Sequence, residues 1–163
     1  MKISILLPYK ENYSPDYAGA VSLFVNDTIK HSKFYKTIQV FGNTKFKKYL
    51  SSNYTNLSFK KKFFLSRNKL YVETFLDYEK KFNSDIIEIH NRPTYVNIVR
   101  KKYKEKIFFF FHNDPLEMNG SKSLINRLEL LNNVDKVFFN SEWCRQRFFI
   151  NFKDKEKYLK KTL

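Results

Sequence analysis

The sequence predicts one α/β domain with a Rossmann-like, three-layer architecture around a mostly parallel sheet. Short apolar runs alternate with longer amphipathic stretches, which is the pattern of βαβ units. The apolar runs are continuous, as in Ile107-Phe108-Phe109-Phe110-Phe111, and such runs are typical of strands covered on both faces. A chain of 163 residues suits one domain with a proper core and is short for two. We therefore expect a single domain over residues 1–163.

The first half of the chain contains strand and helix patterns in alternation. Strands are expected at 3–7, 38–41 and 85–90, and helices at 18–31 and 67–82. Residues 45–65 fit two interpretations: a short helix around 46–50, or a strand or irregular edge around 57–64. The pattern leaves both open.

The second half continues the alternation. Pro93 suits the first turn of a helix, where its missing N–H has no intrahelical partner. Ser121 or Ser123 is expected to cap a later helix. The core face predicted for that helix consists of Leu124, Ile125, Leu128, Leu130 and Leu131. Further strands are expected at 107–111 and 137–139, followed by a helix at 142–152. The charged tail at 153–163 is expected to be a helix that needs another segment to pack against.

The charge of the chain favours anionic partners. The formal net charge is +15, and no acidic residue occurs between Asp27 and Glu73, where Lys residues are interleaved with Phe and Tyr. A basic module for nucleic acid or for an anionic membrane surface is therefore an alternative function. A solvated face or a compositional bias toward Lys would explain the same charges, and no recognised nucleic-acid motif is present.

Several site chemistries are excluded. The three glycines cannot form a GxGxxG fingerprint or a Walker A loop. Cys144 is the only cysteine, so no internal disulfide is expected, and its place beside Trp143 in a helix favours a core thiol. Three dispersed histidines give no metal-ligand spacing, so no metal is expected. No signal peptide or membrane span is evident, and we expect a cytoplasmic protein.

Polar residues follow four of the predicted strands. These segments are Pro8-Tyr9-Lys10, His90-Asn91-Arg92, His112-Asn113-Asp114 and Asn140-Ser141-Glu142. Ligands bind beyond the carboxyl ends of the strands in open α/β sheets, so we expect His90 and His112 to share one rim. A helix that starts near Gly19 offers backbone N–H groups to an anion. Asn91, Asn113 and Asp114 are also residues that commonly cap helices or form turns.

The order of these features resembles the N-terminal domain of family 4 glycosyltransferases, which have the GT-B fold. The resemblance lies in the opening strand, Gly19, and three segments: Asp85 to Pro93, His112-Asn113-Asp114, and Val134 to Trp143. It implies retaining transfer of a sugar from a nucleotide-sugar donor to a glycan or lipid-linked acceptor, with no metal and no other cofactor.

The resemblance also implies roles for individual residues. His112 would approach the transferred sugar as the catalytic residue. Gly19, Asn113 and Asp114 would lie on the donor side, His90, Asn91 and Arg92 would lie on the acceptor side, and Ser141 and Glu142 would complete the rim.

The chain ends near the point where this family crosses into its second domain. We therefore expect that the C-terminal donor-binding domain is absent, and that transfer requires such a domain in trans. Three interpretations of this chain stay open: a truncated gene product, one part of a split enzyme, or a surviving domain that only binds. The resulting hypothesis is an acceptor-side domain that assembles a bacterial-type surface polysaccharide or glycolipid. We expect it in the cytoplasm or at the inner face of the membrane through contact with anionic lipid, with no nucleic-acid partner.

Overall fold

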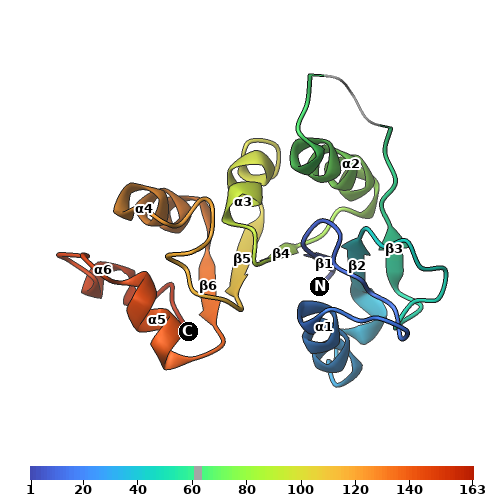
Figure 1. Ribbon diagram of the computed structural model, residues 1–163, viewed down its shortest axis with the longest axis horizontal. Helices are drawn as coiled ribbons and strands as arrows, with labels where there is room; N and C mark the ends of the chain where they lie inside the picture. Colours follow the sequence, from blue (N-terminus) through green and yellow to red (C-terminus); the bar gives the residue numbers. More distant parts are fainter. Residues whose placement is uncertain (61–63) are drawn as a thin grey trace. The chain divides into compact units, whose positions relative to one another are not determined.

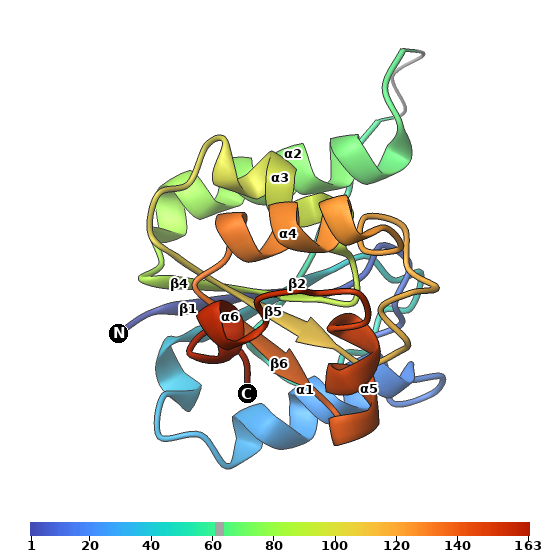
Figure 2. The same cartoon turned by 90° about the vertical axis from the view of Figure 1, so that its left-hand side faces the viewer.

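The computed structural model describes residues 1–60 and 64–163, which form two compact units, Met1–Ile87 and Glu88–Leu163. Each unit has three layers, with parallel strands between helices (Figures 1 and 2). In the first unit α1 and α2 cover opposite faces of the strands. In the second unit α3 and α4 cover one face and α5 covers the other. The expected α/β fold with a parallel sheet and three layers is confirmed.

The first unit is built on β1 (Ile3–Leu6), β2 (Ile38–Gly42) and β3 (Tyr54–Asn56), in the order β3-β2-β1. The pairs are parallel, with Ile3 opposite Ile38 and Val40 opposite Tyr54. The helices are α1 (Ala20–Lys30) and α2 (Arg67–Phe82), with a single 3-10 turn, η1, at Tyr35–Thr37. These bounds agree with the expected strands and helices to within two residues.

A buried carboxylate helps to hold the first unit together. Glu79 on α2 is 4% exposed, and its carboxylate accepts hydrogen bonds from Ser4 Oγ (2.5 Å), Ser84 Oγ (2.5 Å) and Ser84 N (2.6 Å). Burying a charge is tolerated only when several donors replace water. The three donors therefore fix the C-terminal part of α2 against β1 and the segment after the helix.

The second unit contains the end of β4 (Ile86–His90), β5 (Lys106–Phe111) and β6 (Lys136–Phe139), in the order β4-β5-β6. β5 and β6 are parallel, with Phe109 opposite Val137. Its helices are α3 (Pro93–Arg100), α4 (Leu124–Asn133), α5 (Glu142–Phe148) and α6 (Glu156–Leu159). Pro93 is in the first turn of α3 and Ser123 caps α4 through Asn126 N, as expected.

The last residues of the chain lie along β6. Val137 N donates to Lys161 O (2.7 Å), Leu163 N donates to Val137 O (2.9 Å) and Phe139 N donates to Leu163 O (3.0 Å). Thr162 forms a parallel bridge with Val137. The charged tail at 153–163 was expected to be a helix, but only the four residues of α6 are helical, because the final residues satisfy the open edge of β6 instead.

Other expectations need correction. Residues 46–50 are not helical, and the strand in 45–65 is β3, shorter and earlier than expected; Lys61, Lys62 and Phe63 lie outside the described residues. The helix predicted over 142–152 ends at Phe148. On α4, Ile125 is 76% exposed and the buried residue of that turn is Arg127. The charged residue replaces the expected apolar one in the core because backbone carbonyls accept its hydrogen bonds.

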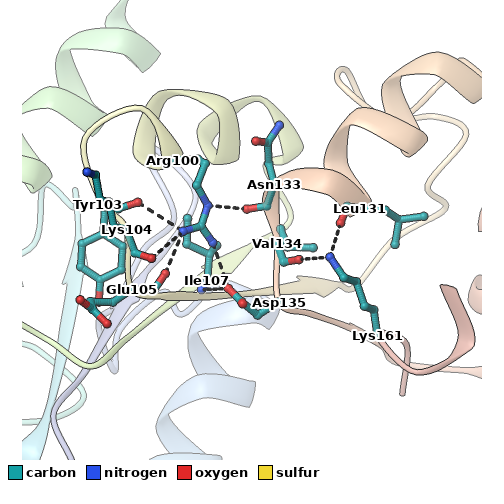
Figure 3. A network of polar contacts seen from close by, with 10 residues as sticks. All are labelled: Arg100, Tyr103, Lys104, Glu105, Ile107, Leu131, Asn133, Val134, Asp135 and Lys161. Atoms are coloured by element: carbon teal, nitrogen blue, oxygen red, sulfur yellow. Dashed lines mark hydrogen bonds and ion pairs between the residues drawn. The ribbon is translucent and has the colours of Figure 1, made fainter.

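Arg100 joins α3 to the neighbouring loops of the second unit (Figure 3). Its Nε donates to Asn133 O (2.9 Å) and its Nη2 pairs with Asp135 Oδ2 (2.9 Å). Nη1 lies near three carbonyl oxygens, with the shortest distance, 2.9 Å, to Glu105 O. Asp135 also accepts from Ile107 N (2.8 Å), so the network reaches the start of β5.

We expect Arg100→Lys to destabilise the protein by about 1–3 kcal/mol, because one ammonium group cannot replace a guanidinium that donates in several directions. Urea unfolding followed by circular dichroism would measure the loss. Lys101→Ala, at the exposed neighbouring position, is the control and should change stability by less than about 0.5 kcal/mol. Equal stabilities of the two variants would contradict the proposed importance of the network.

Candidate functional site

Two histidines meet at the carboxyl ends of β4 and β5 in the second unit. His90 Nδ1 lies 2.9 Å from His112 Nε2, and the ring centroids are 5.2 Å apart. His90 is 1% exposed and stacks on Phe110, with centroids 4.6 Å apart and planes at 10°. The prediction that both imidazoles share one rim is confirmed. The sequence indicated neither the direct hydrogen bond nor the support from Phe110.

A carboxylate lies next to the inner imidazole. Glu88 Oε2 is 3.8 Å from His90 Nε2, and the Glu88 side chain is 19% exposed. Glu88 was not selected from the sequence as a site residue. The one signal that could have indicated it is that a charged residue interrupts the apolar run Ile86-Ile87-Glu88-Ile89. Glu88, His90 and His112 therefore form a row of titratable groups.

His112 is half-buried, and its environment favours the neutral imidazole. Burial, and to a smaller extent the electrostatic effect of His90, lower the pKa of His112 to about 4. At neutral pH the ring is therefore uncharged and can both donate and accept a hydrogen bond.

Asn91 holds the backbone on which His112 is placed. Its φ of 55° is in the left-handed region, which Asn tolerates better than most residues. Asn91 N donates to Phe110 O (2.9 Å), and its Oδ1 accepts from His112 N (2.9 Å). Arg92 Nη1 donates to Asn91 O (2.8 Å). Asn91 is buried and engaged with the loop of His112, whereas the half-buried Arg92 has further guanidinium donors.

The residues after His112 connect the loop to α5. Asp114 Oδ2 accepts from Arg147 Nη2 (2.7 Å) and Nε (3.0 Å), and these hydrogen bonds hold the pKa of Asp114 below its usual range. Asp114 Oδ1 accepts from Leu116 N (2.9 Å), an arrangement typical of an Asp at a turn. Asn113 is exposed and its carbonyl accepts from Cys144 Sγ (3.3 Å). Asn113 therefore presents its side chain to solvent, while Asp114 is tied to Arg147.

Within the rim segment Asn140-Ser141-Glu142, Asn140 is the residue that contacts the loop of His112. Its Nδ2 donates to His112 O (2.9 Å). Ser141 caps α5 by accepting from Cys144 N (3.1 Å), and Glu142 pairs with Arg145 Nε (2.8 Å), which holds the pKa of Glu142 low. Ser141 and Glu142 are exposed. The sequence placed Asn140 in the rim, but only Ser141 and Glu142 were selected as site residues. In the structure it is Asn140 that donates a hydrogen bond to the His112 carbonyl.

Gly19 is described within the first unit. It is the N-cap of α1, and a Cβ at this position would collide with the carboxylate of Glu11. Glu11 Oε1 accepts from Ser22 N (3.2 Å), and Gly19 N donates to Asn12 O (3.0 Å). The structure thus places the side chain of Glu11 at the backbone N–H groups that the sequence suggested for an anion. Pro8, Tyr9 and Lys10 belong to the same unit.

Cys144 is a core thiol, as predicted. It is 1% exposed, and burial raises its pKa to about 11. Within residues 1–60 and 64–163, no group of three or more His, Cys, Asp and Glu side chains is arranged to hold a metal ion. None of the helices in that part of the chain has both the length and the apolar character needed to cross a membrane.

Solved structures share this architecture. The chain matches sucrose-phosphate synthase from Thermosynechococcus elongatus with a TM-score of 0.62 and 13% identity, covering 100% of this chain and 47% of that one. A second structure of sucrose-phosphate synthase from this organism gives 0.59 at 12% identity, with coverages of 93% and 82%. A UDP-N-acetylglucosamine 2-epimerase gives 0.52 at 12% identity, with coverages of 93% and 46%. The chain spans about half the length of the first and third of these proteins.

These likenesses show the fold. The chain has a Rossmann-like α/β architecture of the GT-B fold. No family model matches the chain. No curated protein matches it by sequence either.

The pKa of His112 makes stability depend on pH in a defined window. The unfolded chain takes up a proton on this residue below the ordinary histidine value of about 6.5, whereas the folded protein does so only near 4. The unfolded state therefore binds more protons between these values, and stability falls as the pH is lowered through this window. We expect His112→Gln to reduce this slope in urea unfolding measured from pH 7 to pH 4.

His31→Gln provides the matched control, because it removes an exposed imidazole at the end of α1. The wild type and His31→Gln should lose stability in parallel as the pH falls. A His112→Gln variant with the same slope as both would show that His112 is not protected from protonation.

Proposed function

We propose that this chain is the N-terminal, acceptor-side domain of a glycosyltransferase of the family 4 type. The domain would take part in retaining transfer of a sugar from a nucleotide-sugar donor to a glycan or lipid-linked acceptor. The observation that carries the proposal is the hydrogen-bonded pair His90 and His112 at the carboxyl ends of two neighbouring strands. The GT-B-like fold supports the same reading.

His112 is the proposed catalytic residue. Its half-buried, neutral ring can accept a hydrogen bond from a sugar hydroxyl as charge develops at the reacting carbon. Asn91 and Asn140 hold the backbone of His112 from both sides, so the ring can be placed without a large reorganisation. No metal is required by this arrangement, since the transferred group would be oriented by protein hydrogen bonds.

Arg92 and Asn113 are proposed to bind the substrates. The Arg92 guanidinium uses one nitrogen on the Asn91 carbonyl, and its planar fork suits a phosphate or carboxylate of an acceptor. Asn113 presents an exposed amide beside the histidine loop, which suits a donor-sugar hydroxyl. Asp114 would act on the donor side by fixing this loop through Arg147, and Gly19 would act near the donor phosphates once Glu11 moves away.

The proposed activity needs a second domain that binds the donor. For residues 1–163 alone, this domain would have to be supplied as a separate polypeptide. The test is transfer of radiolabelled sugar from a panel of nucleotide-sugars to lipid-linked acceptors. The chain alone should transfer no sugar, and addition of a complementing GT-B C-terminal domain should restore transfer. Robust transfer by the isolated chain would refute the divided site, and no transfer with any complementing domain would refute the assignment.

Contact with an anionic membrane is proposed as an addition to this function, at the cytoplasmic face. In the first unit Lys45 Nζ lies 5.4 Å from the centroid of the Phe46 ring, which stacks on Tyr17, and the exposed Lys47 and Lys48 follow in sequence. Each such cation contributes roughly 1 kcal/mol near an anionic surface. A salt titration against anionic vesicles and single-stranded RNA separates the possibilities: binding to vesicles alone supports the proposal, and binding to RNA alone favours the nucleic-acid alternative.

A further inference from the structure

Three titratable side chains of the second unit form a continuous row. Glu88 Oε2 lies 3.8 Å from His90 Nε2, and His90 Nδ1 lies 2.9 Å from His112 Nε2. His90 is fixed inside this row, because it is 1% exposed and its ring stacks on Phe110. The two nitrogens of His90 therefore face different partners. A 180° flip of the ring would replace Nδ1 by Cδ2 and Nε2 by Cε1, so this orientation is the one that directs a nitrogen toward each partner.

The short distance between the two rings restricts where the protons lie. A hydrogen bond between two imidazole nitrogens holds one proton, which belongs either to His90 Nδ1 or to His112 Nε2. If His90 Nδ1 carries it and the ring is neutral, the lone pair of His90 Nε2 faces the carboxylate of Glu88. If His112 Nε2 carries it, His90 Nε2–H faces that carboxylate, which is the favourable electrostatic arrangement.

We propose that Glu88 and His90 are positioning residues that hold the proton of His112 on Nε2, so that Nδ1 is the basic nitrogen of His112. Glu88 selects the Nε2–H form of His90, and His90 Nδ1 in turn accepts from His112. The pair thereby determines which nitrogen of His112 can take a hydrogen bond from a sugar hydroxyl. That role in transfer rests on the proposed function, whereas the placement of the proton does not.

The surroundings of His112 are consistent with a proton on its Nε2. The low pKa of His112 keeps its ring neutral at neutral pH, so that it has a single N–H to place. Two nearby carboxylates are paired with other residues: Asp114 with Arg147 of α5, and Glu142 with Arg145 within α5. The Cys144 thiol donates to the Asn113 carbonyl and has a raised pKa, so it does not compete as a base.

The placement of the proton can be measured without any substrate. Long-range proton–nitrogen NMR on the 15N-labelled full chain distinguishes a protonated ring nitrogen from an unprotonated one. His31→Gln identifies the signals of His31, and the His90 variants below distinguish His90 from His112. At about pH 8, above the ordinary histidine pKa, His112 should show a protonated Nε2 and an unprotonated Nδ1. A protonated Nδ1 on His112 would overturn the proposal, including the case in which His90 carries protons on both nitrogens.

Three variants separate positioning from simple packing. Glu88→Gln keeps the size of the side chain and removes its charge, so the single tautomer of His112 should be lost to a mixture. His90→Asn keeps an acceptor near the position of Nδ1 and should retain the Nε2-protonated form. His90→Phe keeps a ring against Phe110 but has no acceptor, so His112 should no longer be held in the Nε2-protonated form. Retention of the wild-type pattern in Glu88→Gln and His90→Phe alike would overturn the proposal.

The transfer assay gives an independent outcome. If the NMR pattern is as expected but no complemented chain transfers sugar, the proton placement stands and the proposed function fails. If transfer is restored but His112 is protonated on Nδ1, the proposed function stands and the positioning role of Glu88 and His90 fails. In each case dispersed backbone spectra of the variants show that the fold is intact.

Discussion

His112→Ala is expected to reduce sugar transfer by the complemented enzyme by about 10²- to 10⁴-fold, the range that a positioned acid–base side chain contributes. The reason is the loss of a neutral imidazole at the rim. The backbone of the loop should survive the change, since Asn91 Oδ1 accepts from His112 N and Asn140 Nδ2 donates to His112 O. Both contacts use the main chain, which alanine retains. Steady-state assays with the nucleotide-sugar donor at a saturating concentration would show this loss as a lower kcat.

Two further substitutions at this position give the matched comparison. The amide oxygen of His112→Asn can accept near the position of Nδ1, whereas that of His112→Gln reaches nearer to Nε2. Higher residual activity in the Asn variant agrees with Nδ1 as the basic nitrogen. His31→Ala, far along the chain at the end of α1, should leave transfer unchanged. A loss of less than tenfold in His112→Ala would remove His112 from the catalytic role.

The parts of the fold that sequence predicted are those where one local rule determines the outcome. Pro93 begins α3 because its ring suits the first helical turn, and the periodic apolar residues of α2 give its bounds at Arg67 and Phe82. That His90 and His112 share one rim followed from the expected parallel direction of their strands, since the carboxyl ends of parallel strands lie at the same edge of a sheet. Local rules were therefore sufficient for the elements and for the meeting of His90 with His112.

The sequence failed where side-chain hydrogen bonds override the apolar pattern. β3 is short and polar, and it is held partly by amides: Asn53 Nδ2 donates to Ile38 O (3.1 Å) and Asn56 Nδ2 donates to Thr44 O (3.0 Å). No hydrophobic periodicity reveals such a strand. In the site, Glu88 was one polar residue in an apolar strand, and only the structure shows that it lies 3.8 Å from His90. Sequence spacing gives no information on which polar atoms will meet.

Arg127 is the clearest case of a residue that hydrophobic patterning misplaces. It is 2% exposed on α4, where an apolar side chain would be expected. Its Nη1 donates to Lys122 O (2.8 Å) and Ser121 O (3.1 Å), and its Nη2 donates to Ile150 O (2.8 Å). The guanidinium also lies 5.7 Å from the centroid of the Phe152 ring. One buried side chain thus joins the loop before α4 to the segment after α5.

Arg127→Met is therefore expected to destabilise the protein by about 3 kcal/mol, because it retains the packing of the stem but leaves three carbonyl groups, one of them fully buried, without these donors. Burial lowers the pKa of the Arg127 guanidinium, but arginine remains charged in proteins, so the loss should persist across neutral pH. Ile125→Ala, on the same helix at a 76% exposed position, is the control and should cost less than about 0.5 kcal/mol. Urea unfolding of both variants measures the difference. If Arg127→Met were as stable as Ile125→Ala, apolar packing alone would suffice at this position, and the carbonyl contacts of Arg127 would not stabilise the second unit.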